Sequence, residues 1–204
     1  IALVDLPSSF YHLLTELARV PVNRDWMCLS DLLRVILDRP FTFEPQSSFD
    51  QELVCQLAIL LARLTTCSIE RHGTALDTII DSHVVGWFVH ALLGLSHAQL
   101  PGQSPRGGVF DTAASSRMPM KVQVCVLYAL SSFARDYVRV VPRILARDSQ
   151  VVISKVIDEI SRSIMLERQT KGTTGNVPMI RVMGLQLLHY VAQYPQGKYH
   201  SFIV

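Results

Sequence analysis

The chain has 204 residues and a formal net charge of +2, and with 49% hydrophobic and 18% charged residues it can bury a sizeable core rather than remain disordered. Its longest nearly apolar run, residues 84–95, is interrupted by His90 and is too short to span a bilayer, which argues against an integral membrane protein. Four cysteines in a chain of this length exclude a disulfide scaffold.

Helical periodicity dominates the first half of the chain, where apolar residues recur every three or four positions. The first such segment places Leu13, Leu14 and Leu17 on its inner face and is ended by Pro21. A capping-box pattern at residues 48–51 begins the third segment, and we expect Gly73 to end it. The predicted helices of this half are 8–20, 25–39, 48–72, 74–80 and 84–95.

Residues 97–117 differ from what precedes them, because they are rich in Gly, Pro, Ser and Ala and have little periodicity, so they predict a loop insertion. Pro119 suits the first turn of the next helix, Asp148 caps the one after it, and a polar break at 170–176 precedes the last. The inner face of the helix after Asp148 is predicted to hold Val151, Val152, Val156, Ile157, Ile160 and Ile164. Strand patterns are almost absent, so we predict an all-α fold of eight or nine helices.

Three of the predicted helices can be laid over one another. They read VCQLAILLARLT from Val54, VCVLYALSSFAR from Val124 and VMGLQLLHYVAQ from Val182, each with Leu three and six positions after the Val. An amphipathic helix precedes each of them. Because one helical hairpin cannot bury its apolar face alone, such units stack on their neighbours. The predicted repeat units are residues 8–72, 73–136 and 137–195.

With this repeat the chain resembles the armadillo/HEAT family. The stretch DTIIDSHVVGWFVHALLG, followed after the insertion by MKVQVCVLYALSSFARD, is similar to an armadillo repeat, in which the third helix lines a groove. The resemblance implies a right-handed α-solenoid of about three repeats. The chain begins without Met, has no signal peptide and stops in an apolar stretch, so we expect residues 1–204 to be a single domain of a longer intracellular protein, nuclear or cytoplasmic.

The resemblance also implies a concave face that binds an extended peptide or a partner protein. Importin-type members hold the peptide backbone with a Trp and, four residues later, an Asn, but here those positions hold Tyr128 and Ser132, and Gln186 and Tyr190. Recognition of classical nuclear signals is therefore not expected. The candidate residues of the partner-binding groove are Gln56, Arg63, Gln123, Tyr128, Gln186 and His189.

Motifs of catalysis, metal binding and phosphate binding are missing from the sequence, so we expect no enzyme and no cofactor. His83, His90 and His97 are seven residues apart, which is about 10 Å along a helix and too far for two of them to ligate one metal ion. Cys55 and Cys125 fall at equivalent positions of the repeat, beside core residues. They are predicted to be small buried hydrophobes.

Charge is distributed unevenly along the chain. Residues 1–100 carry 6 Lys or Arg against 11 Asp or Glu, a net charge of −5, whereas residues 101–204 carry 13 against 6, a net charge of +7. The basic half contains four arginines spaced four residues apart, a ridge that Pro142 would bend around a corner. The residues of this basic ridge are Arg135, Arg139, Arg143 and Arg147.

Two functional hypotheses follow from these patterns. The leading one is a non-catalytic protein–protein interaction scaffold, which holds a peptide or protein partner, acidic partners included, and packs against further repeats of its own parent chain. The alternative is a nucleic-acid-associated module that uses the basic C-terminal half and therefore binds with strong salt dependence. A membrane partner is not expected.

Overall fold

A computed structural model describes residues 8–30, 32–37, 48–66, 69–93, 119–145, 149–169 and 176–194. Within these ranges the chain forms ten α-helices, one short 3-10 helix and no strand, which confirms the all-α class but exceeds the eight or nine helices predicted. The helices are α1 (Ser8–Leu17), α2 (Pro21–Leu29), α3 (Leu32–Leu37), α4 (Ser48–Leu64), α5 (Ile69–Asp81), α6 (Val84–Leu93), α7 (Met120–Asp136), η3 (Val138–Val140), α8 (Val141–Ile144), α9 (Ser149–Gln169) and α10 (Asn176–Ala192).

Several predicted helix boundaries are wrong. The segment expected to be one helix over 25–39 holds the second half of α2, which begins earlier at Pro21, and all of α3, because the backbone at Ser30 is extended (φ −75°, ψ 155°). Pro21 lies in the first turn of α2, where the missing N–H would have no helical partner in any case. Gly73 lies inside α5 instead of ending a helix. The predicted loop at 97–117 and the cap at Asp148 lie outside the described residues.

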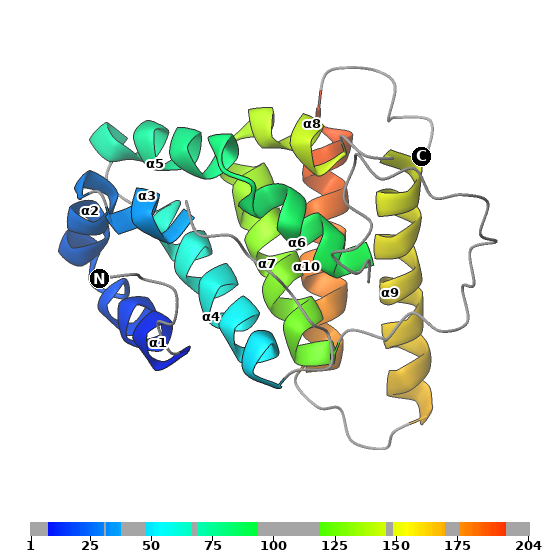
Figure 1. Ribbon diagram of the computed structural model, residues 1–204. Coiled ribbons are helices and arrows are strands. Elements are labelled where there is room, and N and C mark those ends of the chain that lie inside the picture. The colour runs from blue at the N-terminus through cyan, green and yellow to red at the C-terminus, as the bar shows by residue number, and fades with distance from the viewer. Residues whose placement is uncertain are drawn as a thin grey trace, which may run out of the picture.

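Five helices lie side by side in a row, in the order α1, α4, α7, α10 and α9 (Figure 1). The three helices that the sequence aligned with one another, α4, α7 and α10, are therefore direct neighbours in the middle of this row. The shorter elements pack across the row: α6 and η3 contact α7, α6 also contacts α8 and α9, and α2 contacts α4. The helix α7 is central, and most of its side chains are buried.

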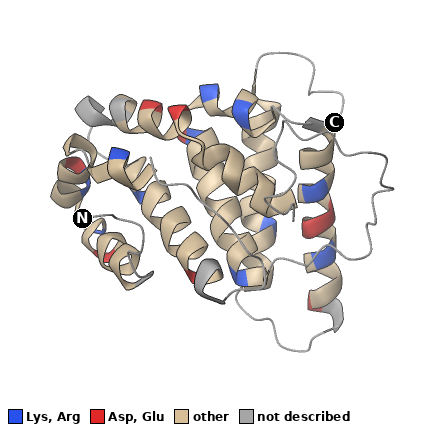
Figure 2. Ribbon diagram, viewed as in Figure 1, with Lys and Arg blue, Asp and Glu red and all other residues tan. Residues whose placement is uncertain are grey.

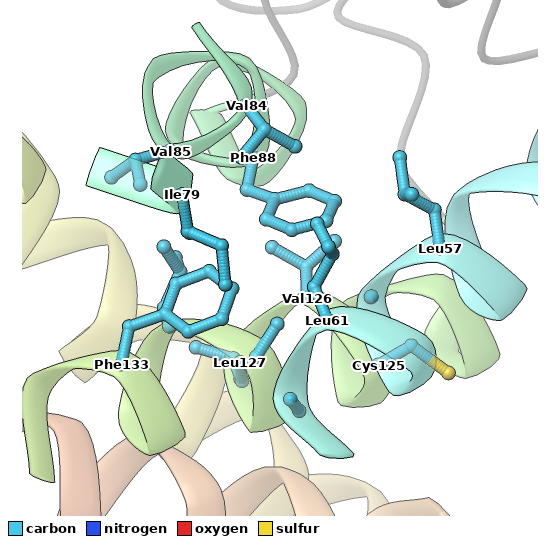
Figure 3. Packing of buried hydrophobic residues seen from close by; sticks show 14 of the residues in the cluster. Leu57, Leu61, Ile79, Val84, Val85, Phe88, Cys125, Val126, Leu127 and Phe133 are labelled. Atoms are coloured by element: carbon cyan, nitrogen blue, oxygen red, sulfur yellow. The ribbon is translucent and has the colours of Figure 1, made fainter. Parts of the chain in front are cut away.

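The core lies between the row and the helices that cross it. Phe88 of α6 stacks on Phe133 of α7, with ring centroids 6.3 Å apart and planes 25° from parallel. Figure 3 shows these rings among aliphatic side chains from four helices, such as Leu61 of α4 and Ile79 of α5. Burial of many such side chains, each contributing about 1.5–3 kcal/mol, fixes the crossing helices on the row.

Candidate interaction surfaces

Each of the helices α4, α7 and α10 leaves a stripe of side chains uncovered. The stripes follow the helical spacing of three and four residues, so each is one face of its helix. We call the following half-buried or exposed residues the open face: Glu52, Gln56, Ile59 and Arg63 of α4, Lys121, Val124 and Tyr128 of α7, and Gln186 and His189 of α10.

Five of the six predicted groove residues belong to the open face. The sixth, Gln123, is buried at 6% exposure, and its neighbour Val124 takes the position on the surface. Successive residues of a helix point about 100° apart, so an error of one residue in the repeat alignment turns a side chain from the surface into the core.

Two members of the open face make polar contacts within the chain. Arg63 Nη1 donates a hydrogen bond to the backbone carbonyl of Thr15 and lies 3.9 Å from Glu16 Oε1, so this side chain links α4 to α1. Gln56 Nε2 donates to Glu52 Oε1 at 2.7 Å within α4. These side chains support the helix packing, which leaves the open-face residues of α7 and α10 better placed to contact a partner.

An ion pair joins α4 to α7 on the open face. Lys121 Nζ lies 2.6 Å from Glu52 Oε2, and the two side chains are 60% and 39% exposed. The hydrogen bonds from Lys121 and then from Gln56 lower the pKa of Glu52, and the bond to Glu52 raises the pKa of Lys121. Both groups are thus held in their charged forms, and the pair fixes the register of the two helices at their N-terminal ends.

The first arginine of the predicted basic ridge is neutralised by its neighbour in the chain. Arg135 donates from Nε and Nη2 to the two carboxylate oxygens of Asp136, at 2.6 and 2.7 Å. This bidentate contact raises the pKa of Arg135 above its usual value. The last residue of the ridge, Arg147, lies outside the described residues.

The two middle arginines of the ridge face the acidic end of α5. Arg139 of η3 donates to the hydroxyl of Tyr137 at 3.2 Å and lies 5.7 Å from the centre of that ring. The same hydroxyl donates to Asp77 of α5 at 2.8 Å, a bond that raises the pKa of Tyr137. Arg143 of α8 lies 3.7 Å from Asp81, also on α5. In Figure 2 the basic side of η3 and α8 therefore lies beside acidic positions of α5.

Exposed large hydrophobic side chains gather on the first three helices and on the last two helices of the chain. Among the described side chains they lie on residues 13–35 and 151–185, and none lies on α4 to α8 between them. We call the first group the N-terminal end face, and it consists of Leu13, Leu17, Val20, Val22, Trp26, Leu29 and Val35. The second group is the C-terminal end face, which consists of Val151, Ile157, Ile164, Met165, Met179, Val182 and Leu185.

The end faces correct the predicted core. Leu13 and Leu17 of α1 are 54% and 42% exposed, although the sequence placed them on an inner face. Val151, Ile157 and Ile164 of α9 are likewise exposed, whereas Val152 and Val156 are buried as predicted. The reason is position: α1 and α9 are the outermost helices of the row, so each has a neighbour in the row on one side only. The periodicity that predicts burial is present, but none of the described helices covers these side chains.

In the parts of the chain that the structure describes, the His, Cys, Asp and Glu side chains form no group that could hold a metal ion. Cys55 and Cys125 are buried at 1% and 7% exposure, which confirms their predicted place in the core. Glu159 of α9 is buried at 2% exposure and bonds to Lys155 Nζ at 2.9 Å and to Arg162 Nη1 at 3.0 Å, a local ion network of one helix. A search of the described helices finds none with the length and apolarity to cross a membrane.

Comparison with known proteins gives no relative from which a function could be transferred. The chain matches no protein-family model, no curated protein sequence and no solved structure. Its function must therefore be argued from its own surfaces.

Proposed function

We propose that this chain is a non-catalytic protein–protein interaction scaffold, a segment of an armadillo/HEAT-like α-solenoid that holds protein partners in a larger assembly. The observation that carries this proposal is the gathering of exposed large hydrophobic side chains on α1 to α3 and on α9 and α10, whereas none of the described side chains of α4 to α8 is among them.

The physical argument concerns the cost of leaving these faces in water. Trp26 is 59% exposed, Leu185 57% and Val22 74%, and burial of such side chains stabilises by about 25 cal/mol per Å² of apolar surface. Single exposed hydrophobic residues are ordinary, but a cluster on adjacent helices marks an interaction surface. In stacked helical repeats the end units require a neighbour or a polar cap for the same reason.

The alternative, nucleic-acid binding, has less support from the described residues. Arg135 and Arg143 pair with carboxylates, and Arg139 contacts Tyr137, so the three arginines face protein groups that a phosphate would have to displace. The two hypotheses differ in salt dependence, because release of counterions from a nucleic acid makes affinity fall steeply with salt. Arg139→Glu with Arg143→Glu should abolish nucleic-acid binding if it occurs, and should leave a partner of the end faces bound.

The proposal is tested by affinity capture from cell extract treated with nuclease, with three forms of the chain compared side by side. Leu185→Glu introduces a charge into the C-terminal end face, and Trp26→Glu does so in the N-terminal end face. His83→Glu is the matched control, because it adds the same charge at an exposed position between α5 and α6. A fourth form with Tyr128, Gln186 and His189 all changed to Ala tests the open face.

The scaffold proposal predicts protein partners that survive nuclease, that the His83→Glu control retains, and that at least one end-face or open-face variant loses. Each variant must keep the helical circular dichroism and thermal midpoint of the parent chain for the comparison to count. Retention of the same proteins by all forms, or loss of all bound material with nuclease, would contradict the proposal.

A further inference from the structure

Two buried thiols lie on the neighbouring helices α4 and α7. Cys55 and Cys125 are both free, and the interaction with the other thiol is the largest influence on the pKa of each. They occupy the same position of the two aligned helices, directly after Val54 and Val124, and these helices are in contact, with the ion pair of Lys121 and Glu52 about one turn before the two cysteines. Figure 3 shows Cys125 projecting from α7 beside α4. The juxtaposition thus follows from the repeat itself.

The surroundings of this pair make one thiol the acid and the other its hydrogen-bond donor. The bond from Cys55 lowers the pKa of Cys125, and the Lys121 ammonium acts in the same direction, while burial and the Glu52 carboxylate oppose it. The pKa of Cys55 is raised, by its bond to Cys125 and by burial. Lys121 precedes Cys125 by one helical turn and Glu52 precedes Cys55 by about the same, so the ion pair lies on the same seam as the thiols.

We propose that Cys55 and Cys125 form a dithiol site at which hydrogen peroxide creates a disulfide between α4 and α7. Such a site lies outside the scaffold function proposed above and does not depend on it. Its ligand class is a small two-electron oxidant that can reach a thiol at the 7% exposed position of Cys125.

The reaction proceeds in two balanced steps. The Cys125 thiolate attacks one oxygen of hydrogen peroxide, the O–O bond breaks, and the products are the sulfenic acid of Cys125 and hydroxide, which takes up the proton that Cys125 had released. The Cys55 sulfur then attacks the sulfenic sulfur, the S–O bond breaks, and the hydroxyl leaves as water with the Cys55 proton. Two thiols are oxidised to one disulfide and one peroxide is reduced to two waters.

The sequence offers a clean test, because trypsin separates all four cysteines. Cleavage after Lys and Arg, but not before Pro, leaves Cys28 in residues 25–34, Cys55 in 35–63, Cys67 in 64–71 and Cys125 in 122–135. The full chain is treated with hydrogen peroxide in native buffer at neutral pH, residual thiols are blocked, and the unreduced digest is analysed by mass spectrometry. A parallel sample is treated in concentrated urea.

We expect the native sample to yield peptides 35–63 and 122–135 joined and two hydrogen atoms lighter, at least tenfold above any other pair of cysteine peptides. The urea sample should lose this preference. Cys28→Ser is the matched control and should leave the cross-link unchanged. Cys55→Ala should abolish the cross-link and leave Cys125 one oxygen atom heavier or over-oxidised.

Two results would overturn the proposal. The first is recovery of the two peptides unlinked and reduced from native protein while Cys28 or Cys67 is oxidised. The second is an equal mixture of disulfides in native and urea samples, which would mean that the pairing does not come from the fold. Both of these results are measured on the parent chain, so they test the proposal even if the Cys55→Ala variant does not fold.

Discussion

Gly184 of α10 lies so close to Ile160 of α9 that a Cβ atom on the glycine would stand 2.9 Å from Ile160 Cγ1. The closest approach of these two helices therefore depends on the missing side chain, as at other crossings where only Gly fits. The α9–α10 contact matters for function because these helices carry the C-terminal end face.

Gly184→Ala should lose stability relative to a matched change elsewhere. At Gly73, inside α5, a Cβ atom would meet nothing within 4 Å, so Gly73→Ala should stabilise the protein by about 0.5–1 kcal/mol through helix propensity alone. Gly184→Ala gains the same propensity but forces Ile160 to move, at a cost of about 1–3 kcal/mol. Urea unfolding of both variants measures the difference. Equal stabilisation would show that the helices are not in close contact, whereas Ile160→Ala, which removes both Cγ1 and Cδ1, should relieve the clash if they are.

The ion pair of Lys121 and Glu52 predicts a stability term that depends on pH. Because the pKa of Glu52 is lowered in the folded chain, its contribution is complete at neutral pH and is lost as the pH falls through that lowered pKa. The size should be about 0.5 kcal/mol, since both side chains are more than a third exposed. A double-mutant cycle with Glu52→Gln and Lys121→Met, measured by urea unfolding at neutral and acid pH, isolates the coupling. A coupling of the same size at both pH values would contradict this account.

Two glutamates of α9 allow a comparison of buried and exposed ion pairs within one helix. Glu159 is buried and meets Lys155 and Arg162, whereas the Glu167 side chain is 36% exposed and lies 2.6 Å from Arg181. Glu159→Gln should destabilise by about 1–3 kcal/mol, because the two cations lose their charged partner at a site with little water. Glu167→Gln should cost less than about 1 kcal/mol. Thermal unfolding of the two variants decides the matter, and equal losses would mean that Glu159 is solvated.

The fold class was predictable from sequence because helical periodicity is strong throughout, and the burial of Cys55 and Cys125 followed from the repeat. Helix ends were less predictable. Gly73 is tolerated inside α5 because tertiary packing outweighs a local cost of about 1 kcal/mol. The break between α2 and α3 at Ser30 depends on backbone angles that the residue pattern did not predict.

The candidate surfaces were only partly predictable. Tyr128 and Gln186 were chosen by the family resemblance and do reach the surface, whereas Gln123 is buried and its neighbour Val124 is the more exposed. Packing against further repeats was expected, but the residues of the two end faces were not predicted. Apolar periodicity predicts that Leu17 and Ile157 are suited to burial. It does not predict whether a neighbouring helix is present to bury them, because that depends on the place of the helix in the row.

The central claim, that partners bind the uncovered faces of this helical row, is tested most directly by hydrogen–deuterium exchange of the chain with and without a captured partner. The account predicts slower exchange in the partner complex for amides of α9 and α10, or of α1 and α2, with Leu185→Glu or Trp26→Glu removing the corresponding protection. Protection confined to α5, α6 and α8, with the end faces exchanging as in the free chain, would contradict it.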